Sequence, residues 1–254
     1  MSFRRFKSTL RTMGPILQKT LPYEASHTNA LPAIKPLDPQ DWLLIDEAYA
    51  GQMRERERLI ADHRDSVIML DAQALEAAEE LLEQALLFMQ SLPGFEVENE
   101  TVICPDHRRV TVLAHDPLAT LGRLFQNDFC ILQKIDDEHV LTGAVLCFPA
   151  SWTLAEKFMR PLSVIHDLVP DYDANIEKRV QRLFDGVKAD RPLWRFNALH
   201  YAKPDLYQPR RHDDPRTPLK RGTARYFRSE RQTLVRLPTT NAVIFGIHTF
   251  VLEA

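Results

Sequence analysis

The sequence is poor in glycine and cysteine, and it lacks the common nucleotide-binding signatures. Its 254 residues include only eight glycines, and neither a GxGxxG nor a GxxxxGK[ST] pattern occurs. A dinucleotide-binding or P-loop function is therefore unsupported. The three cysteines, Cys104, Cys130 and Cys147, lie far apart and form no CxxC pair. Neither a disulfide framework nor a cysteine zinc site is indicated, and free thiols fit a reducing compartment.

Strong net charge and long apolar runs are also absent. The formal net charge is −3, so no basic field indicates a nucleic-acid partner or an acidic surface. The longest apolar runs, such as residues 144–150, are far shorter than the roughly 20 residues that span a membrane. Hydrophobic content of 44% and charged content of 26% are ordinary for a globular protein. We therefore expect no nucleic acid and no membrane span.

The N-terminal segment, residues 1–22, is unusually basic. It holds five Lys or Arg and no acidic residue, and Phe3, Phe6 and Leu10 are spaced for one helix face. This composition is typical of an organellar transit peptide. A basic helix that packs on the body of the protein explains it equally well. The expected location is cytoplasmic, with a mitochondrial location as the alternative.

Residues 23–100 are predicted to form a helical N-terminal region. After a proline-rich linker, Asp38 caps a helix that runs from Pro39 to about His63. Its run RERER at 54–58 is interpreted as a solvated face. Asp71 caps a second amphipathic helix, which Pro93 and Gly94 end.

Residues 101–254 are predicted to form an α+β core. Residues 129–135 and 139–148 have the pattern of a β-hairpin, and a helical stretch at 150–185 follows. The strand candidates 193–202, 224–237 and 242–252 come last. Short turns within each group imply antiparallel pairing. A five-stranded antiparallel sheet with helices inserted after the second strand is the topology of a PAS domain.

Four strings carry a resemblance to a known family. They are PLDPQDWL at 36–43, FQNDFCIL at 125–132, FPASWTLAEKFMRPLSVIHDLVPDYD at 148–173 and SERQTLVRLPTTNAVIFGIHTFV at 229–251. Together the chain resembles, over roughly residues 31–252, the haem-dependent oxidative N-demethylase alpha subunit family, formerly a domain of unknown function.

The resemblance implies a PAS-like core that carries haem b. It also implies oxidative removal of a methyl group from a small alkylamine such as dimethylamine, with O2 and electrons from a partner reductase of the flavin or iron–sulfur type. A further helix after the last strand is implied too, and this sequence ends at Ala254 without it. A haem-based sensor without catalysis and a non-haem protein with a small-molecule pocket stay open as alternatives.

His166 is the predicted axial ligand of the haem iron, because it matches the Ile-His-x-x-Val-Pro segment of the resemblance. From the residue pattern alone, His166 lies on the apolar face of a short helix and reads as a core histidine with one hydrogen bond. His200 is the main rival, since it shares a strand face with Trp194 and Phe196. His248 is a weaker rival.

The planar guanidinium group of arginine can donate paired hydrogen bonds to the carboxylates of a haem. Arg231 is the first candidate, and Arg160 and Arg228 are second choices. A structural salt bridge or a solvated surface position explains each of them as well. The acids that lie within the family-like strings, and that could hold an alkylammonium substrate, are Asp128, Glu156 and Glu230.

Overall fold

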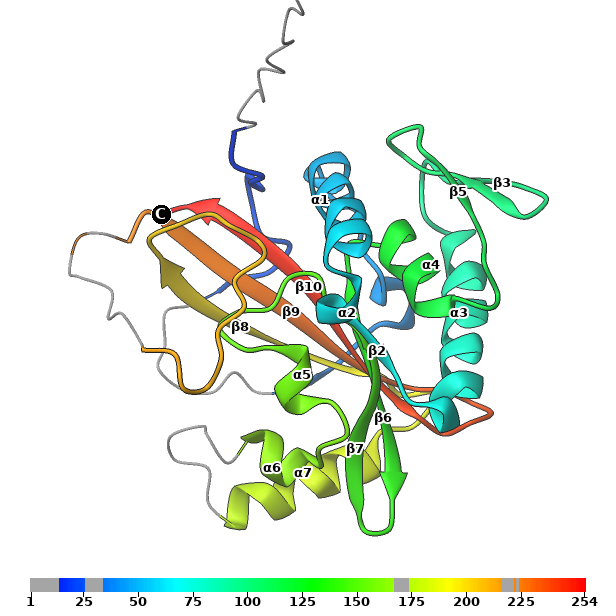
Figure 1. The fold of residues 1–254 in the computed structure, drawn as a ribbon, viewed down its shortest axis with the longest axis vertical. Coiled ribbons are helices and arrows are strands. Elements are labelled where there is room, and N and C mark those ends of the chain that lie inside the picture. Colours follow the sequence, from blue (N-terminus) through cyan, green and yellow to red (C-terminus); the bar gives the residue numbers. More distant parts are fainter. Residues whose placement is uncertain (1–13, 26–33, 167–173, 216–221, 223) are drawn as a thin grey trace, which may run out of the picture.

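A central antiparallel sheet organises the computed structural model, which describes residues 14–25, 34–166, 174–215, 222 and 224–254. Within these ranges the sheet has seven strands in the order β1-β8-β9-β10-β6-β7-β2, and a smaller sheet has the order β3-β4-β5 (Figure 1). The α+β class is therefore confirmed, although the main sheet has more strands than the five expected. The strands are β1 (Lys35–Pro36), β2 (Ile68–Leu70), β3 (Glu96–Glu98), β4 (Thr101–Ile103), β5 (Arg109–Thr111), β6 (Asp128–Ile135), β7 (Glu138–Val145), β8 (Leu193–Tyr201), β9 (Tyr226–Arg236) and β10 (Val243–Glu253).

Helices cover both faces of the main sheet (Figure 1). On one face, Phe129, Ile131 and Ile244 pack in a core with residues of the first group of helices. That group is α1 (Tyr49–Asp62), α3 (Leu75–Met89) and α4 (Pro117–Leu124), with the short α2 (Arg64–Val67) leading into β2. On the other face, Cys130, Leu234 and Val243 pack with residues of the second group. That group is α5 (Leu154–Lys157), α6 (Leu162–His166) and α7 (Ala174–Gly186).

The two faces follow from strand geometry, because successive side chains of a strand point to opposite sides. Ile131 and Cys130 are neighbours in β6 yet belong to different cores, and so do Ile244 and Val243 in β10. The pairing of Phe245 with both Cys130 and Leu234 aligns the second face across β6, β10 and β9.

Both predicted hairpins are confirmed. Strands β6 and β7 pair around the turn at Asp136, whose φ of 53° is one that aspartate tolerates better than most residues. Strands β9 and β10 pair along their whole length, from Val243↔Arg236 to Glu253↔Tyr226. The carboxylate of Glu80 on α3 accepts hydrogen bonds from the backbone N–H groups of Thr239 and Thr240 in the connecting turn, at 2.7 and 2.8 Å.

The predicted helix from Pro39 to His63 is wrong in its first part. Asp38 does accept a hydrogen bond from the Gln40 N–H, but the helix it caps is a 3-10 turn, η1 (Pro39–Asp41). The α-helix begins only at Tyr49. In between, the Asp46 backbone N–H donates to Gln126 Oε1, and its carboxylate accepts from the Ala48 N–H. These contacts replace helical hydrogen bonds, which explains the break.

The prediction that the run RERER is solvated is wrong at its centre. Arg56 has an exposed fraction of 0%, and its guanidinium donates to Asp128 at 2.7 Å and to the Gly122 carbonyl at 2.9 Å. One residue of five therefore faces inward, as helical periodicity allows. The guanidinium also lies over the Phe148 ring, and this cation–π contact ties α1 to the segment that leaves β7.

Candidate functional site

Strands β8 and β9 direct a row of polar side chains to the face that α5 to α7 cover. Arg195 pairs with Gln232, and Asn197 pairs with Glu230. Alternation along β9 places Gln232 and Glu230 on the same side as Leu234, which belongs to the core beneath α5 to α7. Polar groups therefore line a region that is otherwise apolar.

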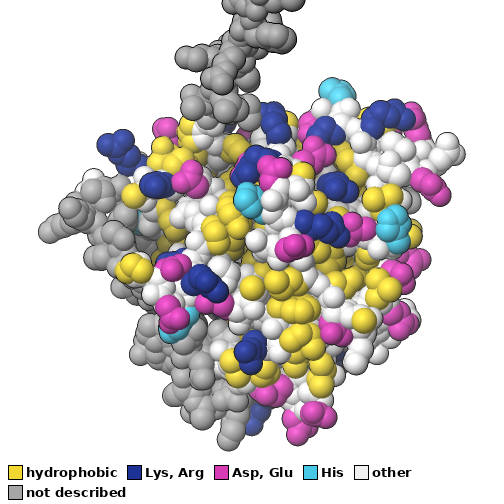
Figure 2. All heavy atoms as spheres, viewed as in Figure 1, with side chains coloured by type: hydrophobic (Ala, Val, Ile, Leu, Met, Phe, Trp, Pro, Cys, Tyr) yellow, Lys and Arg dark blue, Asp and Glu magenta, His cyan; other side chains and the backbone are white. Residues whose placement is uncertain are grey.

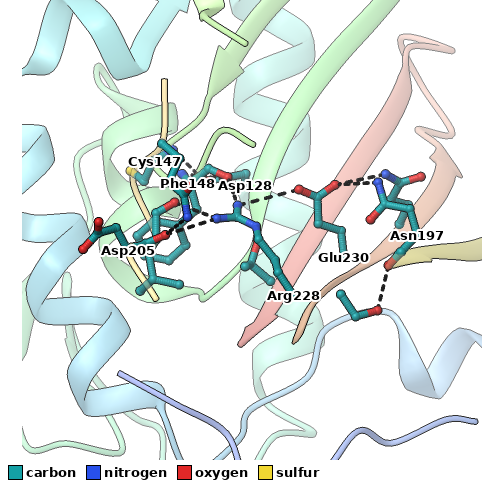
Figure 3. A network of polar contacts seen from close by, with 12 residues as sticks. Asp128, Cys147, Phe148, Asn197, Asp205, Arg228 and Glu230 are labelled. Carbon is teal, nitrogen blue, oxygen red and sulfur yellow. Dashed lines mark hydrogen bonds and ion pairs between the residues drawn. The ribbon is translucent and has the colours of Figure 1, made fainter. Parts of the chain in front are cut away.

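Glu230 is the centre of this row and is 7% exposed. Its Oε2 accepts from Asn197 Nδ2 at 3.0 Å and from Gln232 Nε2 at 3.3 Å. Arg228 Nη2 lies 3.6 Å from Oε1, so the carboxylate sits between the guanidinium and the amide (Figure 3). A buried carboxylate needs such partners, because burial without them is costly. Glu230 is thus held in a defined orientation on this face.

Arg228 and Asp128 fix the chain where it leaves β7. The Arg228 guanidinium is buried and donates to the Phe148 carbonyl at 2.6 Å and to the Leu206 carbonyl at 3.0 Å. Asp128 accepts from the Cys147 and Phe148 N–H groups at 2.7 and 2.9 Å (Figure 3). The Phe148 residue is therefore anchored through both its N–H and its carbonyl. This anchoring positions the following segment, which carries Trp152 and α5.

Lys157, at the end of α5, adds a partly buried cation. Its Nζ lies 4.1 Å from the centroid of the Trp152 ring, a cation–π contact. Burial lowers the pKa of Lys157, while acidic neighbours that include Glu230 oppose the shift. The ammonium group therefore lies in a partly desolvated position against the Trp152 ring.

Arg195 is the second such cation. Its Nε is buried and has no hydrogen-bond partner among the residues described. Burial lowers the pKa of Arg195, and Glu230 opposes this shift. A buried donor without an acceptor costs free energy, so an anionic group placed here would gain a charge-assisted hydrogen bond.

Apolar side chains lie on the same side of the sheet as these cations. They are only partly buried and pack against the core beneath α5 to α7; they are Trp152, Ile165, Leu193 and Phe245. Partly exposed apolar groups on the side of the sheet that holds these two cations suit a ligand that is largely apolar and carries carboxylates.

Several of the sequence-predicted residues lie away from this row. Arg231 points to the opposite face, where its guanidinium donates to the Asp41 and Trp42 carbonyls. Arg160 is exposed. Glu156 is exposed on α5 and accepts from the His212 N–H at 2.9 Å. Of the predicted residues, the structure brings together Arg228 and Glu230, with Asp128 anchoring the adjoining segment.

The candidate histidines are also separated. His166 ends α6, and its side chain lies outside the described residues. His200 is exposed on the face opposite α5 to α7, and its ring packs on Phe227 at 5.3 Å. His248 is fully buried, with Nε2 2.9 Å from Asp46 Oδ2 and Nδ1 3.3 Å from Asn127 Oδ1. Both nitrogens of His248 are thus already engaged.

Four residues of the row did not come from sequence reasoning: Lys157, Arg195, Asn197 and Gln232. A signal for two of them is present, because Arg195 and Asn197 alternate with apolar residues along β8. Residues 228–233 of β9 are all polar, so no alternation marks Gln232. The alternation in β8 indicates a polar stripe on one strand face, although it does not distinguish a buried stripe from a solvated one. Lys157 has no comparable signal, since its burial depends on Trp152 and on the sheet.

The described ranges hold neither a cluster of metal-ligating side chains nor a membrane-spanning helix. Within them, no three side chains of the His, Cys, Asp or Glu type lie together as they would to hold a metal ion. Across the same part of the chain, no helix combines the length and apolar character needed to cross a bilayer.

Comparison with known protein families identifies the chain. The model of a family described as haem-dependent oxidative N-demethylase, alpha subunit-like, matches residues 33–254. The match includes β1 to β10 and helices α1 to α7, so it covers the whole main sheet and both helical layers. This confirms the resemblance found in the four sequence strings. The chain therefore belongs to the haem-dependent oxidative N-demethylase alpha subunit-like family.

Proposed function

We propose that this chain binds haem b between the main sheet and α5 to α7, and that it serves the oxidative N-demethylation of a small alkylamine such as dimethylamine. Family membership supports haem dependence. The chain order supports a PAS-like arrangement, since the β6–β7 hairpin is followed by α5 to α7 and then by β8, β9 and β10. The observation that carries the proposal is the buried Arg195 Nε without a partner among the described residues, on the side of the sheet that α5 to α7 cover, where Lys157 adds a second cation.

The residues present fit a haem. A haem is a flat apolar group with two carboxylates, and such carboxylates pair well with arginine and lysine. Arg195 has a buried Nε without a partner, and Lys157 has a pKa lowered by burial. We assign the two carboxylates to these side chains rather than to Arg228, because both terminal nitrogens of Arg228 already donate to backbone carbonyls and only its buried Nε has no partner among the described residues. His166 remains the proposed axial ligand.

The chain's own residues would hold and orient the amine. An alkylammonium ion needs a carboxylate or an aromatic face once it leaves water. Glu230 is a buried carboxylate on this face. Asp128 is fully used by Arg56 and two backbone N–H groups, so Glu230 is the better candidate. The bound haem would supply the O2 and electron-transfer chemistry.

Partner proteins are part of the proposal. The family description names an alpha subunit, which implies further components. An oxidation that consumes O2 needs electrons, and we propose a reductase of the flavin or iron–sulfur type as their source.

Haemin titration of the purified chain tests the site. Replacement of Arg195 or Lys157 by alanine should weaken haemin binding on the order of tenfold each, the worth of one charge-assisted hydrogen bond. Arg191→Ala is the matched control, because Arg191 lies just before β8 and its side chain is 76% exposed. Equal haemin affinity of the Arg195, Lys157 and Arg191 variants would refute the assignment.

Formaldehyde release from dimethylamine, with a chemical reductant and O2, tests the activity. The haem-loaded protein should release it, and Glu230→Gln should raise KM for the amine without altering the haem spectrum. If the protein binds haem but releases no formaldehyde, the proposed catalysis is refuted and only the haem-binding part of the proposal stands.

A further inference from the structure

A groove on another part of the molecule runs between α3 and the small β3-β4-β5 sheet. Its volume is about 710 Å³, which is in the range of ligand-binding clefts. It is formed by residues of the N-terminal half and lies away from α5 to α7 in Figure 1. The lining residues that the argument uses are Leu82, Leu87, Val97 and Val102 among the apolar ones, and Glu79 and Glu83 among the acidic ones.

The floor of the groove is apolar and open to water. Val97, Val102 and Val110 are aligned across the three strands and point to one face of the small sheet. Val102 and Val110 are buried, whereas Val97 is 57% exposed. Leu87, across the groove on α3, is 55% exposed. Two large apolar side chains are thus exposed in the same groove, whereas exposed apolar side chains on protein surfaces are usually isolated.

The rim of the groove is acidic. Glu79 and Glu83 on α3 and Glu100 beside β4 line it, and none of the residues that line it is a lysine or an arginine. Acidic side chains gather along the edge of the molecule at which Figure 1 places α3 (Figure 2). The net charge of the whole chain is only −3, so this acidity is local. Charge complementarity therefore selects a basic partner.

The shape of the groove favours a helix as the occupant. The lining residues of α3 run from Glu79 to Met89 and recur at helical spacing along one face. Eleven residues of helix extend over about 17 Å, which matches roughly three turns of a second helix. An amphipathic helix placed in an apolar groove is a common mode of protein recognition. We propose that this groove docks a basic amphipathic helix of a partner protein.

Fluorescence anisotropy with a synthetic probe tests the proposal. The probe is a labelled 14-residue peptide with leucine at helical a and d spacing and lysine elsewhere, and its partner peptide has glutamate in place of lysine. The lysine peptide should bind saturably and lose affinity as salt rises, because exposed charges are screened. The glutamate peptide should not bind. Equal binding of the two peptides would overturn the proposal.

Variants locate the binding. Leu87→Asp and Val97→Asp replace exposed side chains, so the fold should survive. Each should lower the affinity for the lysine peptide at least tenfold. Ile135→Asp is the control, since Ile135 is 40% exposed at the end of β6. Hydrogen exchange should show protection of α3 and β3 on peptide binding. Unchanged affinity of the lysine peptide for both groove variants would overturn the proposal. A dimer of the chain that Leu87→Asp and Val97→Asp dissociate would also overturn it, because the groove would then bind a second copy of the chain.

Discussion

At the scale of single residues, burial decides what each charged side chain does in this protein. Arg56 and Asp128 are 0% and 1% exposed and are paired at 2.7 Å, so their charges compensate one another in the interior. Arg195 and Lys157 are also largely removed from water, yet Arg195 Nε has no partner among the described residues. The Arg56–Asp128 pair is therefore structural, even though Arg56 Nη2 also has no partner among the described residues. Arg195 and Lys157 are the cations that we propose for the haem carboxylates.

Replacement of Asp128 should be strongly destabilising. Asp128→Ala leaves Arg56 buried without its counter-ion and removes the acceptor of two backbone N–H groups, so we expect a loss of about 3–5 kcal/mol. Asp185→Ala removes an exposed ion pair of similar length, Lys134–Asp185 at 2.6 Å, and should cost about 0–1 kcal/mol. Urea unfolding of both variants measures the difference. Equal losses would contradict the structural role of Asp128.

Asp46 should make stability depend on acid pH. Burial alone would raise its pKa, but hydrogen bonds from His248, Gln126 and Gln18 outweigh burial and lower the pKa to about 2. Because the folded pKa lies below the unfolded value, this contribution is complete above pH 4 and is lost as the pH falls toward 2.

The wild-type free energy of unfolding should therefore fall by about 2 kcal/mol more than that of Asp46→Asn between pH 5 and 2. Urea titrations at a series of pH values measure this. Parallel pH profiles of the two proteins would show that Asp46 is not responsible.

At the scale of elements, one side chain joins α3 to the β9–β10 turn. The Glu80 carboxylate accepts from two backbone N–H groups and from the Thr240 hydroxyl at 2.6 Å. Glu80→Ala leaves these donors without that acceptor, and we expect a loss of about 1–3 kcal/mol. Glu79→Ala, an exposed change one residue earlier, should be near neutral. Thermal unfolding of the pair checks this, and similar melting temperatures would be the contrary result.

Elements with a repeating pattern could be predicted from the sequence, and elements set by tertiary contacts could not. The β6–β7 and β9–β10 hairpins combine two strand-length segments with turn residues between them, so their pattern is local. The break before Tyr49 depends on Gln126, which is 80 residues from Asp46 in the chain. Strand β2 has three residues and exists through its pairing with β7. Neither the break before Tyr49 nor strand β2 can therefore be predicted from the neighbouring residues in the sequence.

The candidate site divides in the same way. Glu230 and Arg228 could be selected because they stand in or beside a family-like string. Lys157 and Arg195 could not, because their value lies in desolvation by neighbours from other elements. Arg231, the first candidate for a haem carboxylate, lies on the face that packs against residues 41 and 42 rather than on the face that α5 to α7 cover, and no local pattern distinguishes the two faces.

At the scale of the whole molecule, the sheet separates two environments. One face packs on α1, α3 and α4 in a large apolar core, and it holds Arg231 and His248. The other face carries Glu230, Arg195 and their neighbours beneath α5 to α7. The acidic groove beside α3 borders the first of these environments and lies away from α5 to α7, so partner docking and haem binding can be tested separately.

The absorption spectrum of the protein purified from haem-supplemented cells tests the central claim most directly. The account predicts a Soret band that shifts on reduction with dithionite and addition of CO, with the intensity of one haem per chain. A flat visible spectrum, unchanged after haemin is added to the purified chain, would contradict haem binding by this protein.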